Sequence, residues 1–145
     1  MKNVLKILPP FAASVTAWLV ARLGGWDAAL QMMFLMMGID LFTGVLCALM
    51  GKSKATEGGR FLSREMFQGL SRKMMMLALV VLATALDTLL TLDGVSRAAV
   101  IGFYCANEGL SIVENAALLG VPFPKGLLEA LERFRDSQEE DVKPS

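Results

Sequence analysis

Residues 28–51 read AALQMMFLMMGIDLFTGVLCALMG, an apolar stretch in which Asp40 is the only charged residue. About 20 mostly apolar residues are enough for a helix to cross the hydrocarbon core of a bilayer. The nine large apolar side chains of the stretch contribute roughly −4 kcal/mol to insertion, against about +3 kcal/mol for an aspartate at the centre of a span. The stretch therefore predicts a transmembrane helix, by a narrow margin.

The composition of the whole chain agrees with a membrane protein. Of 145 residues, 54% are apolar and a further 13 are glycine, which is more than one small soluble core can bury. Basic and acidic residues number 14 each, so the net charge gives no reason to expect a nucleic-acid partner. Histidine is absent, and Cys47 and Cys105 lack metal-ligand spacing. We therefore expect no enzyme, no cofactor and no metal site.

Four apolar segments predict an all-α integral membrane protein with three to four transmembrane helices. A soluble four-helix bundle is the alternative, but these segments lack the polar faces that it needs. The first segment contains Pro9 and Pro10, and either crosses the membrane or lies in its interface; a cleaved signal peptide fits it poorly. The candidate spans are 7–23, 28–50, 74–92 and 97–119, in a membrane domain 1–120 followed by a cytoplasmic tail 121–145 with an amphipathic helix.

The distribution of lysine and arginine predicts the orientation, because cytoplasmic loops carry an excess of both. Four crossings with both ends inside place twelve basic residues in the cytoplasm and two outside, whereas three crossings give ten and four. Four crossings is thus the preferred count, in a bacterial cytoplasmic membrane. The basic loop that we assign to the cytoplasm contains Lys52, Lys54, Arg60, Arg64, Arg72 and Lys73.

The fourth segment carries an unusual number of polar residues for a span. At 100° per residue they occupy one arc of about 120°, and the opposite face is small or apolar. Such an arc predicts a pore-lining or subunit-joining helix. Internal hydrogen bonding with Asp40 and Asp87 is the alternative, but the acids outnumber the expected intramembrane cations. The arc consists of Arg97, Tyr104, Asn107, Glu108, Ser111, Glu114 and Asn115.

Two further acids lie alone in their segments. Asp40 is flanked by Gly38, Thr43 and Gly44, a pattern that permits close helix approach. Asp87 lies among threonines at helical spacing. Either acid could serve a proton-coupled transport step or join two helices through a hydrogen bond.

Three blocks of sequence resemble a phage holin family that includes the clostridial toxin-secretion holins. They are Ile39–Val45, Gln68–Lys73, where Gln68 replaces the family's usual lysine, and the long block Phe103–Ala116 followed by Leu119–Pro122. The resemblance covers about two thirds of the chain. It implies a homo-oligomer that forms lesions among the lipids of the bacterial cytoplasmic membrane and releases an endolysin or a toxin. A small proton-coupled exporter, using Asp40 or Glu108, is the alternative function.

Overall fold

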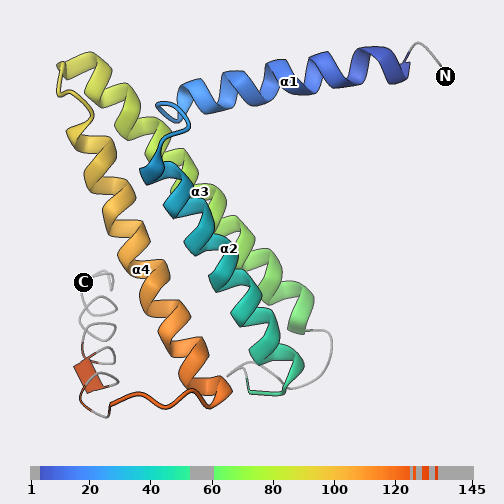
Figure 1. Cartoon of the computed structure of the whole chain (residues 1–145), viewed down its shortest axis with the longest axis vertical. Coiled ribbons are helices and arrows are strands. Elements are labelled where there is room, and N and C mark those ends of the chain that lie inside the picture. Colours follow the sequence, from blue (N-terminus) through green and yellow to red (C-terminus); the bar gives the residue numbers. More distant parts are fainter. Residues whose placement is uncertain (1–3, 53–60, 125, 127–128, 131–132, 134–145) are drawn as a thin grey trace, which may run out of the picture.

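Four helices form the part of the chain that the structure describes (Figure 1). This computed structural model describes residues 4–52 and 61–124 and the single positions 126, 129, 130 and 133. Within those residues there is no strand, so the all-α prediction is confirmed. The predicted amphipathic helix of the tail lies largely outside them. The helices are α1 (Val4–Arg22), α2 (Ala28–Leu49), α3 (Phe61–Leu90) and α4 (Val95–Leu119).

Helices α2, α3 and α4 run alongside one another, whereas α1 leaves one end of this bundle crosswise (Figure 1). The turn from α1 to α2 depends on Gly24 and Gly25, whose φ angles of +85° and +103° favour glycine. A Cβ at Gly24 would also lie 2.5 Å from Nε of Arg97, so a larger residue there would displace that side chain. Asp27 then caps α2, because its Oδ1 accepts a hydrogen bond of 2.9 Å from the Leu30 backbone N–H.

Helix α3 is longer than the predicted third segment. It starts at Phe61, whereas the predicted third segment starts at residue 74. Arg64, Arg72 and Lys73 are good helix formers, so their charges do not interrupt the helix. Lys73 therefore lies inside this helix and not in a loop.

The two ends of α4 are set by glycines in the left-handed region. Gly94 precedes the helix at φ +83°, and Gly120 follows it at φ +97°, with its backbone N–H bonded to Ala117 O at 3.0 Å. Val121–Pro124 continues without helical structure. The two prolines cannot extend the helix, so α4 stops where the sequence predicts that the fourth segment ends.

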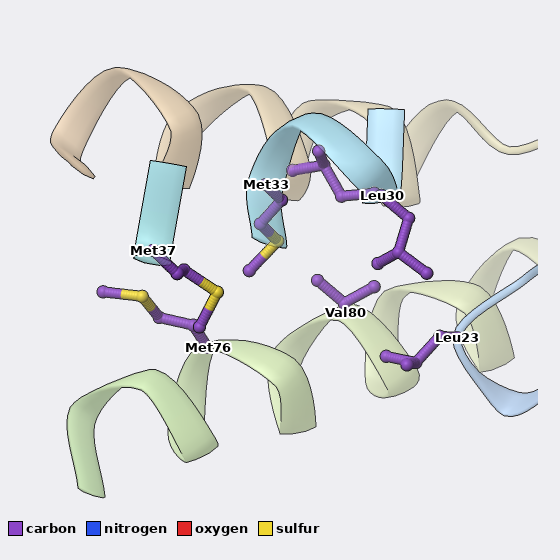
Figure 2. Packing of buried hydrophobic residues seen from close by; sticks show 7 residues of the cluster. Leu23, Leu30, Met33, Met37, Met76 and Val80 are labelled. Atoms are coloured by element: carbon purple, nitrogen blue, oxygen red, sulfur yellow. The ribbon is translucent and has the colours of Figure 1, made fainter. Parts of the chain in front are cut away.

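The buried apolar core is small and lies toward the end of the bundle where α1 joins it. Figure 2 shows Leu30, Met33 and Met37 of α2 facing Met76 and Val80 of α3, with Leu23 of the α1–α2 turn beside them. Ile101 adds a buried contact from α4. Methionine supplies much of this packing because its flexible thioether fills irregular gaps.

Most of the bundle's apolar side chains lie outside this core. Two helical segments of the described chain, Ala28–Leu49 and Met66–Leu90, are long and apolar enough to cross a membrane. Only 17% and 28% of their most apolar windows are buried, whereas the core helix of a soluble protein would be mostly buried. Phe42, Leu89 and Phe67 are 64%, 77% and 71% exposed. An apolar exterior of this extent suits contact with lipid.

Candidate functional site

A cluster of ionised side chains joins α2, α3 and α4 in the interior of the bundle. Lys73 of α3 donates from Nζ to Asp40 Oδ2 of α2 at 2.9 Å and to Glu108 Oε2 of α4. The Lys73, Glu108 and Asp40 side chains are 10%, 3% and 21% exposed. Each of the three helices therefore contributes one charged group to a common contact.

The cluster contains two carboxylates and one ammonium group, which is a net charge of −1 when all three are ionised. Taking such groups out of water costs several kcal/mol each, and their mutual attraction compensates only when all partners are present. Asp40 and Glu108 therefore both depend on Lys73, the cation that they share. Loss of Lys73 leaves two uncompensated carboxylates among apolar helices.

A second layer of hydrogen bonds continues the cluster toward the end of α4. Asn115 Nδ2 donates to Asp40 Oδ1 at 3.2 Å and to Thr43 Oγ1 at 3.0 Å. Thr43 in turn donates to the Ile39 carbonyl of its own helix at 2.9 Å. Cys47, which is 2% exposed, donates its thiol to the Asn115 carbonyl at 3.4 Å. We call Asp40, Thr43, Lys73, Glu108 and Asn115 the inner cluster.

The predicted intramembrane acid Asp87 has a different role from Asp40. Its two carboxylate oxygens accept hydrogen bonds from the backbone N–H groups of Ser96 and Arg97, at 2.8 and 2.9 Å. Gly94 provides no side chain to cap α4, so Asp87 satisfies the first N–H groups of that helix from the end of α3. This contact fixes the turn between the two helices.

Arg97 joins the same end of the bundle to the α1–α2 turn through hydrogen bonds and an ion pair. Its Nε donates to the Leu23 carbonyl at 2.6 Å, and its Nη1 and Nη2 contact the two carboxylate oxygens of Asp27 at 2.7 and 3.1 Å. Hydrogen bonding from Arg97 is the largest cause that lowers the pKa of Asp27 to about 2, followed by the bond from the Leu30 backbone. We call Asp27, Asp87 and Arg97 the end clamp.

The residues of the predicted polar arc of α4 have different environments in the structure. Arg97, Glu108 and Asn115 bond to other elements of the same chain. Tyr104 packs against the core and forms an edge contact with Phe103, at 5.3 Å between ring centroids. Asn107, Ser111 and Glu114 are half-buried. The pore-lining or subunit-joining role of the arc stays a prediction.

The residues assigned to the basic loop also fall into different places. Lys52 is exposed and donates to the Leu119 carbonyl at the end of α4 at 3.5 Å, and Arg72 is exposed on α3. Lys54, Arg60 and the side chain of Arg64 lie outside the described residues. Lys73 differs from the expectation, because it is buried in the inner cluster.

A sequence signal for the burial of Lys73 did exist. Lys73, Met76, Val80, Ala83 and Asp87 recur at spacings of three and four along α3, and all five are buried. This is the helical periodicity of an inward face. Because Lys73 follows the other basic residues of the basic loop in sequence, we assigned it to that loop and not to this inward face. No group of three or more Cys, Asp or Glu side chains in the described part of the chain is placed to hold a metal ion.

The chain is similar to known proteins over most of its length. The bacteriophage holin family matches residues 17–136. A probable holin of Bacillus phage phi105 is 36% identical over 123 residues, 85% of this chain and 86% of the relative. The uncharacterized protein YqxH of Bacillus subtilis strain 168 is 35% identical over 77% of this chain and 74% of the relative. An uncharacterized 14.9 kDa protein of Clostridium perfringens is 29% identical over 95% of this chain and its own full length. No solved structure matches the chain.

Proposed function

This chain belongs to the bacteriophage holin family, and from that premise we propose that it oligomerises in the host cytoplasmic membrane and opens lesions through which an endolysin reaches the cell wall. The family resemblance noted in the sequence is confirmed by the match over residues 17–136. Holins are non-enzymatic membrane proteins, and membership in the family therefore places this chain among them.

The observation that carries the proposal is the inverted polarity of the bundle. Charged side chains lie inside it, at Asp40, Lys73 and Glu108, while large apolar side chains cover its outside. A protein with this distribution is compatible with lipid while its helices stay together. The same helices carry polar groups that water could solvate if they separated.

We propose that the described bundle corresponds to the stored state of the holin. In this state the inner cluster shields its charges within one chain, so the protein accumulates without making the membrane permeable. Side-by-side association at high density then turns the side of α4 that carries Glu108 and Asn115 toward a shared aqueous space, where water replaces the internal partners of these two residues. Water is an alternative partner only for polar groups, so the apolar core has no similar reason to open.

For the topology we propose three crossings, by α2, α3 and α4, with α1 along the outer surface. The crosswise course of α1 in Figure 1 supports this count, although the distribution of basic residues favours four crossings slightly. Trp18 and Trp26 are 57% and 56% exposed near the end of the bundle where α1 joins it, as suits an interfacial aromatic belt. Protease treatment of intact spheroplasts removes an N-terminal tag if this topology is correct, and spares the tag if α1 also crosses.

The function is tested by inducing the chain in a bacterium with and without a cytoplasmic endolysin. Lysis and release of whole cytoplasmic proteins are expected only when both are present. Growth that continues with both, or a proton flux that depends on a small solute without protein release, contradicts the proposal. The second outcome would support the small proton-coupled exporter instead.

A further inference from the structure

Asn107 and Ser111 are two neighbouring polar side chains of α4 that form no hydrogen bond with the described residues. Asn107 and Ser111 are half-buried and lie one helical turn apart. Within the part of the chain that the structure describes, neither side chain has a hydrogen-bond partner, in contrast to Glu108 and Asn115 on the same helix. Within the polar arc, Glu108 and Asn115 thus have partners inside the chain, whereas Asn107 and Ser111 have none among the described residues.

The position of Asn107 in α4 makes it unusual that its side chain has no hydrogen-bond partner among the described residues. It is the central residue of the 25-residue helix α4, so a crossing α4 places it deepest in the membrane. Water is absent at that depth, and a polar group there gains stability from a protein partner. Ser111 lies about 6 Å further along the axis, by the rise of 1.5 Å per residue, and extends the same polar strip.

An apolar hollow adjoins this strip on the same side of α4. It has a volume of about 340 Å³ and lies between α3 and α4, where its lining includes Leu82, Leu86, Phe103 and Tyr104. Phe103 precedes Asn107 by one turn and is 55% exposed. By helical spacing, the apolar hollow and the polar strip therefore follow one another along the same side of α4.

We propose that this surface binds the same surface of a second copy of the chain, with Asn107 and Ser111 as the central hydrogen-bonding residues. The inference rests on the proposed function, because it assumes that α4 crosses the membrane. All copies then insert in one direction, so a twofold axis along the membrane normal brings identical residues together at the same depth. Asparagine carries both donors and acceptors on its amide and is complementary to itself. Two copies of Asn107 thus satisfy each other where lipid cannot.

Cysteine cross-linking in lipid vesicles tests the interface directly. In a background with Cys47→Ala and Cys105→Ala, N107C and S111C are each compared with A106C under mild oxidation. Ala106 is exposed at the same depth but points about 100° away around the helix, which makes it a matched control. We expect disulfide-linked dimers several-fold faster from N107C and S111C than from A106C. Equal rates at all three positions, or no dimers from any, overturn the proposal.

A second measurement avoids the cysteine-free background. In the otherwise unchanged chain, Asn107→Leu is expected to weaken dimerisation in detergent by about three- to ten-fold, the range for one interhelical hydrogen bond in a membrane. Ala106→Leu, which adds a similar apolar volume beside it, is expected to leave dimerisation unchanged. Equal effects of the two substitutions contradict the interface.

The same variants separate this inference from the proposed function. Lysis that depends on endolysin, without preferential cross-linking at residue 107, leaves the holin function intact and overturns the interface. Preferential cross-linking at residue 107 in a chain that causes no lysis supports the interface and contradicts the proposed function.

Discussion

The inner cluster and the end clamp both join helices through charged side chains, but they use charge in different ways. In the end clamp, Arg97 neutralises Asp27 close to the end of the bundle, and Asp27 is 49% exposed. In the inner cluster, one lysine is shared by two carboxylates that are mostly or fully buried. The end clamp fixes loop geometry, whereas the inner cluster places several ionised groups where separation of the helices would leave them without partners. We expect the stored state to depend far more on the inner cluster.

The largest expected effect comes from Lys73→Met. The substitution leaves Asp40 and Glu108 inside the bundle without a cation, and breaking a buried ion pair in this way costs about 3–5 kcal/mol. We expect a large fall in the Tm of the detergent-purified protein and abnormal lysis timing. Arg72→Met is the matched control, because Arg72 is the adjacent basic residue of α3 and is exposed.

A compensated variant shows whether charge is the cause of that loss. Replacing all three members, in Lys73→Met with Asp40→Leu and Glu108→Leu, removes the uncompensated charges and is expected to restore much of the Tm. If the triple variant is no more stable than Lys73→Met, the account of Lys73 as the cation that compensates Asp40 and Glu108 is wrong.

Gly24→Ala is expected to disturb the end clamp by about 1–3 kcal/mol. The alanine would be held in a left-handed backbone conformation that disfavours it. Its Cβ would also displace Arg97 from the Leu23 carbonyl and Asp27. Gly25→Ala shares the backbone strain at φ +103° but meets nothing within 4 Å, so its smaller fall in Tm isolates the contribution of Arg97. Equal losses for the two variants would show that contact with Arg97 contributes nothing.

Asn115→Ala should have a smaller effect, of about 1 kcal/mol. It removes hydrogen bonds to Asp40 and Thr43 but no charge, and hydrogen bonds between helices in membranes are modest. The Tm of Asn107→Ala serves as comparison, because Asn107 has no partner within the described part of the chain. A larger loss for Asn107→Ala than for Asn115→Ala, measured on the monomer, would contradict the division of the polar arc.

The smallest effect concerns pH and the end clamp. The pKa of Asp27 is lowered to about 2 in the folded protein, from an ordinary value of 3.8. The stability that this carboxylate contributes is therefore fully present above about pH 4 and is lost as the pH falls toward 2. Because the Asp27 side chain is 49% exposed, we expect the ion pair to contribute less than about 1 kcal/mol. Asp27→Asn should remove this part of the acid sensitivity, and an unchanged pH profile would contradict it.

The sequence predicts the helical class well, because that depends on local patterns. Long apolar segments, and the glycines at positions 94 and 120, are visible within a few turns of chain. The predicted segment 28–50 and α2 occupy nearly the same residues. The polarity of one face of α4 was equally visible, since it follows from helical spacing alone.

The partners of that polar face could not be predicted in the same way. Arg97 contacts Asp27 from 70 positions away, and Lys73 contacts Glu108 from 35 positions away. A helical wheel shows which side of α4 is polar but contains no information about which helix covers it. Assigning Lys73 to a loop also removed the one cation that can serve both acids, and this made internal pairing look less favourable than it is.

The central claim is that the inner cluster is closed to water before lysis and open to it afterwards, and Cys47 reports this most directly. Its thiol is buried against Asn115, and in a Cys105→Ala chain it is the only cysteine. A charged methanethiosulfonate reagent should label Cys47 little in membranes taken before lysis and extensively in membranes taken after it. Equal labelling at both times would contradict the account.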